Sequence, residues 1–307
     1  MQSYTHWTGL GAEARGASVA MGNFDGVHLG HQSVIDLART EAPLGIITFE
    51  PHPREVFAPD APAFRLMNAE ARSHRLEKLG VERLFELPFN KELAGMEPEA
   101  FAREVLAEGL GVSHVTVGGD FRFGKRRAAG TAELIELGHR YGYEVTVAPL
   151  LHIDGVEVSS TNIRRALSEG RPEDAAKMLG HLHRIEGAVL HGDKRGKGLG
   201  FPTANMSVSG LHLPKLGVYA VKVDVLTGPQ AGSYHGAASL GVRPMFGENT
   251  PNLETFIFDF DGDLYDQHLS VALVAYLRPE MKFDGLEGLM KQMAQDCDQA
   301  RKILANV

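Results

Sequence analysis

Two histidines three residues apart follow the first apolar run of the chain. The run SVAM is followed by GNFDGVHLGHQ, which contains His28 and His31. Imidazoles have an ordinary pKa of ~6.5, so near neutral pH they can donate hydrogen bonds to phosphate oxygens and stabilise charge in a transition state. One alternative is a pair of ordinary surface or core histidines. Another is a metal site with His52 as a third ligand, although no acidic or thiol ligand stands at suitable spacing.

The residues around these histidines are typical of an anion-binding turn. Gly22 and Gly26 allow a tight turn and the close approach of a ligand. A helix that begins near Gly30 would present backbone N–H groups and the positive end of its dipole to an anion. The segment therefore predicts phosphate binding at a strand-to-helix turn.

Two further segments carry side chains suited to phosphate. SSTNIRRAL places Ser160 and Thr161 at a helix start and Arg164 one turn in, where they can hold a polyphosphate by charge-assisted hydrogen bonds. VGGDFRFGKRRAAG, residues 117–130, combines a glycine-rich backbone with Arg122 and three more basic residues. The plainer interpretations are a capped helix with a solvated arginine and a solvated basic loop.

Another glycine-rich segment, HGDKRGKGLGFPTAN, occupies residues 191–205. Its glycines could let backbone amides surround phosphates, and Thr203 and Asn205 offer hard oxygen ligands for Mg²⁺. No Walker A sequence occurs, since no Gly-Lys pair precedes Ser or Thr, so a kinase would need a loop of this other kind. A basic hairpin is the plainer interpretation. The candidate nucleotide ligands in the loop are Gly192, Lys194, Gly198 and Gly200.

The apolar pattern predicts two architectures in succession. Up to about residue 148, short apolar runs alternate with amphipathic segments, which predicts a parallel α/β sheet with ligands beyond the carboxyl ends of its strands. From residue 185 to 277 the chain is β-rich, as in an antiparallel barrel. We expect two domains, residues 1–182 and 183–307. The expected strands are 18–21, 45–49, 83–87, 114–119 and 144–148, then 184–190, 217–226, 233–240, 254–260 and 269–277.

The chain closes with apolar residues at helical spacing, which predicts a helix packed on the barrel. Cys297 lies in this stripe and is the single cysteine, so it excludes an intramolecular disulfide and is expected to be a small core residue. The segment FDFDGDLYD, residues 258–266, imitates a phosphatase loop but is interpreted as an Asp-Gly hairpin turn. The stripe comprises Leu286, Leu289, Met290, Met293, Cys297, Ala300 and Leu304.

Charge and composition narrow the possible classes of protein. Hydrophobic residues make up 43% and charged residues 23%, which is ordinary for globular domains. The formal net charge of -8 disfavours attraction to nucleic acid or anionic lipid, so we expect neither a nucleic-acid nor a membrane partner. The sequence shows no secretory signal pattern and no run of ~18 apolar residues. These features predict a cytoplasmic protein.

The motifs of the first half carry a family resemblance. GNFDGVHLGH together with SSTNIR resembles the HxGH nucleotidyltransferase superfamily, and TFEPHP and GGDFRFG are similar to its FAD synthetase branch. The resemblance implies a Rossmann-like nucleotidyltransferase domain in which the phosphate of FMN attacks the α-phosphorus of ATP, giving FAD and pyrophosphate. It implies that His28 and His31 stabilise the pentacovalent phosphorus. It implies that pyrophosphate is bound by Ser160, Thr161 and Arg164. The implied nucleotide contacts are Gly22, Asn23, Phe24, Gly26 and Asp120. The implied flavin contacts are Phe121 and Arg122.

The motifs of the second half resemble a different family. The stretch that ends in PTAN is similar to the riboflavin kinase domain, as are GVYA, LETFIFDFDGDLY and LRPEMKF. The resemblance implies a six-stranded antiparallel barrel with a terminal helix, which binds ATP and riboflavin. Glu254 would be the general base that accepts the proton of the ribityl 5′-hydroxyl, although an exposed strand glutamate is the alternative. The remaining implied contacts are Thr203 and Asn205 on Mg²⁺, Pro202 on the nucleotide and Arg278 on the flavin.

Both resemblances together span nearly the whole chain. They imply a bifunctional riboflavin kinase/FAD synthetase with riboflavin, FMN, FAD and ATP as substrates or products and Mg²⁺ as cofactor. One rival is a nucleotidyltransferase for another phosphorylated small molecule. A second is a flavin-sensing module with an inactive kinase half. Lys197 and Met245 leave this rival open, because the family commonly has Arg and Thr there. The sequence does not indicate the oligomeric state.

Overall fold

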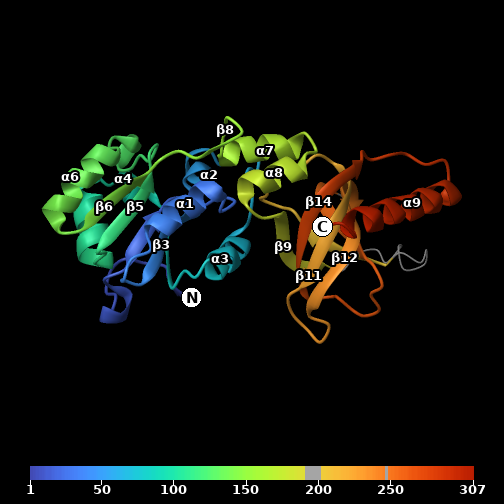
Figure 1. Ribbon diagram of the computed structural model, residues 1–307, viewed down its shortest axis with the longest axis horizontal. Coiled ribbons are helices and arrows are strands. Elements are labelled where there is room, and N and C mark those ends of the chain that lie inside the picture. The colour runs from blue at the N-terminus through green and yellow to red at the C-terminus, as the bar shows by residue number, and fades with distance from the viewer. Residues whose placement is uncertain (191–201, 246–247) are drawn as a thin grey trace. The chain divides into compact units, whose positions relative to one another are not determined.

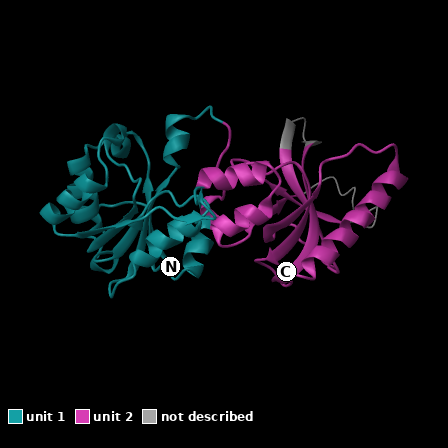
Figure 2. Cartoon of the chain, turned by 45° about the horizontal axis from the view of Figure 1, so that its top comes forward, with its two compact units in different colours: residues 1–61, 72–159 teal, residues 62–71, 160–307 magenta. Residues whose placement is uncertain are grey.

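The computed structural model describes residues 1–190, 202–245 and 248–307 (Figure 1). The chain forms two compact units, which Figure 2 shows in different colours. The first unit contains residues 1–61 and 72–159, and the second contains residues 62–71 and 160–307. Each unit is described by itself.

The first unit, all of whose residues are described, is built on a parallel sheet of six strands in the order β1-β4-β3-β2-β5-β6. The five strands expected in this part of the chain are confirmed within one or two residues at their ends. The edge strand β1 was not predicted, because three residues with no buried side chain give no apolar pattern. The strands are β1 (Gln2–Tyr4), β2 (Ser18–Met21), β3 (Leu44–Glu50), β4 (Arg83–Pro88), β5 (His114–Gly118) and β6 (Glu144–Ala148).

Helices connect these strands and bury their apolar sides against the sheet. The alternation of apolar runs and amphipathic segments produces this arrangement, because each helix must cover an apolar sheet. The amphipathic segment between β4 and β5 is π-helical over Phe101–Leu110 (η2). The other helices are η1 (Ala12–Ala14), α1 (Leu29–Leu37), α2 (Pro53–Phe57), α3 (Ala69–Lys78), α4 (Lys91–Gly95), α5 (Pro98–Ala100), η3 (Lys125–Arg127) and α6 (Thr131–Tyr141). Near the end of the unit, the short strand β7 (His152–Ile153) pairs with β8 (Val156–Glu157).

The second unit contains a closed antiparallel barrel, formed in the described residues by six strands in the order β10-β13-β12-β11-β14-β9. Two helices precede it, α7 (Ser160–Ser168) and α8 (Pro172–Leu179), and α9 (Leu286–Leu304) follows it. Alternate residues fill the barrel interior, including Met206, Tyr219 and Leu253. The strands are β9 (His183–Leu190), β10 (Thr203–Ser207), β11 (Gly217–Val225), β12 (Gly232–Met245), β13 (Glu248–Ile257) and β14 (His268–Arg278).

The helix α9 packs on the outside of the barrel, as the apolar stripe predicted. Ala300 and Leu304 are buried against Ala220 and Phe258. The start of the helix differs, because Leu286 is 55% exposed. The apolar stripe is therefore covered mainly in the second half of the helix.

The interpretation of residues 258–266 as a hairpin turn was wrong. This segment connects β13 to β14, and these strands are not neighbours in the barrel, since β13 pairs with β10 and β12. The connection instead reaches α9, where Asp259 forms an ion pair with Arg301 at 2.8 Å. Short-range turn residues could not reveal this, because the strand order depends on long-range pairing.

Candidate active sites

The strand order places two of the predicted loops side by side. The chain builds outward from β2 through β3 and β4 on one side, then continues with β5 and β6 on the other. The strand order therefore reverses between the adjacent strands β2 and β5, and in open α/β sheets ligands bind at the carboxyl ends of strands at such a point. The loop after β2 contains His28, and the loop after β5 contains Asp120.

The two histidines are held together at the start of α1. His28 is the N-cap residue, and its Nδ1 accepts a hydrogen bond from the backbone N–H of His31 at 3.2 Å. The neutral His28 ring therefore carries its proton on Nε2. The two rings are stacked, with centroids 3.6 Å apart and an angle of 16° between the planes. The predicted pair is thus a single structural unit at a helix N-terminus.

The electrostatic state of His31 refines its predicted chemistry. Burial, and secondarily the neighbouring His28, hold the pKa of His31 well below its ordinary value, so this ring is neutral at pH 7. Its Nδ1 is buried, and no hydrogen-bond partner for it exists among the described residues. Buried polar atoms are normally partnered, so this nitrogen suits a ligand. An approaching phosphate would favour the protonated ring and raise its pKa.

The turn before α1 has a strained backbone that burial keeps in place. Phe24 and Val27 have positive φ angles of 51° and 41°, and Gly26 has a φ of 88°. Positive φ is costly for a β-branched residue, yet Val27 is fully buried and Phe24 is 1% exposed. The carbonyl of Val27 also accepts a hydrogen bond from Gln32 Nε2 at 2.9 Å. Such compensated strain is common at ligand sites.

Gly30 permits the close approach of the His28 ring. A Cβ at this position would lie 3.1 Å from Cε1 and Nδ1 of His28 and 3.3 Å from the carbonyl oxygen of Val158. These distances are shorter than ordinary van der Waals contacts between heavy atoms. Gly30 thus acts as a spacer for His28, in addition to the role at the helix start that its position suggested.

The loop after β5 is closed by its own side chains. Arg122 donates hydrogen bonds to the carbonyl oxygens of Arg127 and Ala128, at 3.0 and 3.3 Å from Nη2, so its guanidinium braces the loop. The rings of Phe121 and Phe123 stack with centroids 5.9 Å apart. Asp120 is exposed at the strand end. The structure thus places Asp120 and Phe121 just beyond the carboxyl end of β5.

Ser160, Thr161 and Arg164 belong to the second compact unit. The predicted helix is confirmed, and α7 begins at Ser160 itself. The Nε of Arg164 donates a hydrogen bond to the carbonyl of Phe64 at 2.6 Å, and the guanidinium lies 5.4 Å from the centre of the Phe64 ring. Within its unit, Arg164 is therefore firmly oriented.

The barrel places a second set of predicted residues on its outer wall. Thr203 and Asn205 alternate with the buried Ala204 and Met206 along β10, so they share the outer face. Glu254 on β13 lies directly opposite Asn205. The segment PTAN was interpreted as a loop, but its last three residues begin a strand that pairs with β13. Hydrogen bonds at 3.1 and 3.4 Å join Nδ2 of Asn252 to Asn205 Oδ1 and Glu254 Oε1.

These residues fit a magnesium ion held jointly with a nucleotide. Mg²⁺ usually takes one or two protein oxygen ligands together with water and substrate phosphates. The hydroxyl of Thr203 and the amide oxygen of Asn205 supply that number on one face of a strand. In the described part of the chain, no group of three His, Cys, Asp or Glu side chains could hold a metal. His52 instead caps α2, where its Nδ1 accepts from the Arg54 N–H at 3.0 Å.

A pocket of about 150 Å³ in the second unit joins polar and apolar parts of the outer wall. Thr203 and Glu254 line it together with Arg278, so the structure brings together residues proposed for metal, base and flavin contacts. Cys297 also lines the pocket, although it was expected to be only a core residue. The apolar lining is formed by Val218, Ala237, Ala238, Phe256, Met281, Phe283, Leu289 and Met293.

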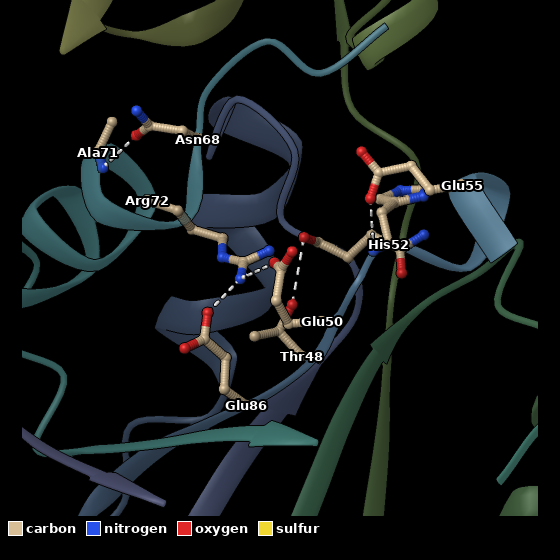
Figure 3. Close-up of polar contacts among 9 residues, drawn as sticks. Thr48, Glu50, His52, Glu55, Asn68, Ala71, Arg72 and Glu86 are labelled. Carbon is tan, nitrogen blue, oxygen red and sulfur yellow. Dashed lines mark hydrogen bonds and ion pairs between the residues drawn. The ribbon is translucent and has the colours of Figure 1, made fainter. Parts of the chain in front are cut away.

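Two sets of polar residues in these units were not predicted from sequence. Arg72 is buried and forms an ion pair with Glu50 at 2.9 Å and another with Glu86, so it joins α3 to the ends of β3 and β4 (Figure 3). In the other unit, Asp296 on α9 is buried beside Arg278. Each ion pair is formed by residues far apart in the chain, so no local motif signalled it.

Several predicted contacts lie outside the described residues. These are Gly192, Lys194, Gly198 and Gly200, and the departure at Lys197 lies there too. Pro202 is described and directly precedes β10.

Comparisons with known proteins agree with both halves of this arrangement. A family model described as FAD synthetase matches residues 11–162, and one described as riboflavin kinase matches residues 179–304. A bifunctional riboflavin kinase/FMN adenylyltransferase of Pseudomonas fluorescens is 39% identical over 96% of each chain. The relative of the same name in Escherichia coli K12 is 34% identical over 95% of this chain and 94% of its own.

The fold has a close match among solved structures. A crystal structure described as a macrolide-efflux protein from Streptococcus pneumoniae has a TM-score of 0.83 and 28% sequence identity, with 98% of each chain covered. In the part of this chain that the structure describes, no helix has the length and apolar character needed to span a membrane.

A parallel sheet with a histidine pair at its switch point, followed by a closed barrel with a hydroxyl, amide and carboxylate on its outer wall, defines a two-part nucleotide-dependent transferase. The matches over nearly the full length are more specific. This chain belongs to the bifunctional riboflavin kinase/FMN adenylyltransferase family.

Proposed function

We propose that this chain makes FAD from riboflavin in two ATP-dependent steps. In the first, the 5′-hydroxyl of riboflavin attacks the γ-phosphate of ATP and gives FMN and ADP. In the second, the phosphate of FMN attacks the α-phosphorus of another ATP and gives FAD and pyrophosphate. The observation that carries the proposal is the match of two family models to successive parts of the chain, 11–162 and 179–304.

For adenylyl transfer, we assign the stabilisation of the charge that develops on the α-phosphate to residues at the start of α1. His28 would donate from Nε2 and His31 from its ring to the oxygens of the α-phosphorus, where negative charge accumulates. The stacked rings and the strained turn hold these donors before the substrate arrives, which lowers the cost of reorganisation. Arg164, Ser160 and Thr161 would bind the pyrophosphate that leaves.

The remaining contacts of this site follow from its position on the sheet. The turn formed by Gly22, Asn23, Phe24 and Gly26 would approach the nucleotide, because it ends the strand next to the switch point. Asp120 would contact the nucleotide, and Phe121 and Arg122 would contact the flavin.

For riboflavin phosphorylation, we assign the chemistry to the outer wall of the barrel. Glu254 would accept the proton of the 5′-hydroxyl as the oxygen attacks phosphorus. Thr203 and Asn205 would hold Mg²⁺, which when bound offsets phosphate charge. Pro202, Gly192, Lys194, Gly198 and Gly200 would contact the nucleotide. Arg278, which lines the pocket, would contact the flavin.

We also propose the boundaries of the two domains and the cellular location of the protein. We assign residues 1–182 to the adenylyltransferase domain and residues 183–307 to the kinase domain, and we place the protein in the cytoplasm without a nucleic-acid partner. The net charge of -8 supports the last point.

A time course tests the proposed activities. Purified protein is incubated with riboflavin, ATP and Mg²⁺, and riboflavin, FMN and FAD are separated by chromatography. FMN should appear before FAD. If the protein converts supplied FMN to FAD but makes no FMN from riboflavin, the kinase assignment is contradicted. If FMN accumulates and no FAD forms, the adenylyltransferase assignment is contradicted.

A further inference from the structure

An ion pair in the wall of the barrel pocket fixes the position of Arg278. Arg278 is the last residue of β14, and Asp296 lies in the middle of α9. The Nε of Arg278 donates to both carboxylate oxygens of Asp296, at 2.9 and 3.1 Å, and Nη2 donates to Oδ2 at 2.7 Å. Three hydrogen bonds of this kind leave the guanidinium little freedom to rotate.

The same guanidinium holds a third part of the pocket wall. Its Nη1 donates to the carbonyl of Pro279 at 2.9 Å, and its central carbon lies 5.8 Å from the centre of the Phe283 ring. Gln292 donates to Asp296 Oδ1 at 2.9 Å. The pair thus joins the end of β14, the connection that follows it and α9, all of which line the pocket.

Asp296 is buried and Arg278 is largely buried, which makes a purely stabilising role a weak explanation. The side chains of Arg278 and Asp296 are 16% and 7% exposed. Removing two charges from water is costly, and well-packed apolar residues often join two elements equally well. A charge pair in this position instead offers the pocket a fixed donor group without net charge. That suits the ring system of riboflavin, which is uncharged at neutral pH.

We propose that Asp296 is a positioning residue for riboflavin phosphorylation, which orients and neutralises Arg278 and holds α9 at the spacing that admits the flavin ring. The inference rests on the proposed kinase function and deepens it. Without the carboxylate, an uncompensated guanidinium would have to be desolvated when the ring covers it. Loss of Asp296 should therefore weaken riboflavin binding more than it slows the chemical step.

The first test is steady-state kinetics of Asp296→Asn in the full chain. We expect the KM for riboflavin to rise about tenfold or more with kcat changed less than about threefold, since charge burial affects binding. FAD formation from supplied FMN should stay at the wild-type rate, which shows that the first unit is folded, and the nearly unchanged kcat for FMN formation shows that the barrel is folded. Asp296→Glu should restore most of the affinity, and Asp298→Asn, an exposed residue on the same helix, should change nothing.

The single cysteine supplies a second readout that does not depend on turnover. Cys297 lines the same pocket, and burial, with a smaller contribution from the Asp296 charge, raises the pKa of its thiol to about 11. Alkylation by iodoacetamide should therefore be slow in the wild type, and riboflavin should slow it further. In Asp296→Asn, alkylation should begin at lower pH, because a nearby negative charge is gone, and protection should need about ten times more riboflavin.

The outcomes separate this inference from the proposed function. If the wild type phosphorylates riboflavin and Asp296→Asn has the wild-type KM and the wild-type protection curve, the positioning role is overturned while the kinase function stands. If the wild type neither phosphorylates riboflavin nor is protected by it, the kinase function fails and this inference with it. Equal loss of FMN and FAD formation in both Asp296 variants would also overturn it, because that result indicates a structural role.

Discussion

His28 and His31 could be recognised from sequence, because a spacing of three residues at the start of a helix places two side chains on the same side of it. The ring stacking and the hydrogen bond from the His31 N–H to His28 Nδ1 follow from that spacing. The neutral state of His31 could not be foreseen, since burial by distant parts of the chain lowers its pKa. Asp296 was equally hidden, because its partner Arg278 lies 18 residues away and only folding joins them.

Gly30 gives a test of whether the His28 position matters for adenylyl transfer. Gly30→Ala should lower the rate of FAD formation about tenfold or more, because a Cβ 3.1 Å from the His28 ring forces it to move, and displaced catalytic groups lose rate. The fold should remain, since Ala favours a helix over Gly by about 0.5 to 1 kcal/mol. The matched control is Gly95→Ala in α4, where a Cβ meets nothing within 4 Å. Wild-type FAD formation by Gly30→Ala would reject the spacer role.

At the scale of elements, strands with strong apolar runs were predictable and those defined by their partners were not. The runs that became β2, β3 and β5 are buried on both faces, so they read as continuous apolar segments. β10 begins with Thr203 after Pro202, and its strand character comes from pairing with β13. The π-helical form of η2 likewise was not predictable, since its apolar spacing fits an ordinary amphipathic helix.

The junction of α3 with β3 and β4 depends on Arg72. Arg72→Met should lower the free energy of unfolding of the first unit by about 2 to 3 kcal/mol, because two partly buried carboxylates lose their counter-charge. Trp7 is the single tryptophan, and it is buried in this unit's core, so its fluorescence in urea reports this unfolding. Arg103→Met, at a half-exposed ion pair in the same unit, should change stability by less than about 0.5 kcal/mol. Equal effects of the two substitutions would contradict the account.

The strand β9 should make the barrel sensitive to acid. Burial, with smaller contributions from His181 and His212, lowers the pKa of His183 to about 3. In the unfolded chain the His183 imidazole binds a proton near pH 6.5, whereas in the folded chain it does not. The free energy of unfolding is therefore undiminished above pH 6.5. As the pH falls toward 3, it decreases by up to about 1.4 kcal/mol per pH unit.

Amide hydrogen exchange on β9 and β14 measures this pH dependence. His183→Gln should flatten the loss of protection between pH 6.5 and 5, and His235→Gln, on an exposed residue of the same unit, should leave the wild-type slope. A wild-type slope in His183→Gln would show that other groups cause the acid sensitivity.

At the scale of the whole molecule, the two architectures were predictable because their hydrophobic periods differ. Alternating strands and helices gave the parallel sheet, and successive short strands gave the barrel. The connection at residues 258–266 was not predictable, because its Asp-Gly sequence fits a hairpin while the strand order requires a crossing to a distant strand. The position of the pocket on the outer wall, under α9, also depends on long-range packing.

The central claim is that the two reactions use separate sites on one chain, and one paired measurement tests it most directly. FMN and FAD formation are measured side by side for His28→Ala and Glu254→Gln. We predict that His28→Ala makes FMN at the wild-type rate but FAD about a hundred to a thousand times more slowly, since a lost transition-state donor costs about 2.7 to 4 kcal/mol. Glu254→Gln should make no FMN from riboflavin yet convert supplied FMN to FAD normally. Equal loss of both activities in either variant would contradict the claim.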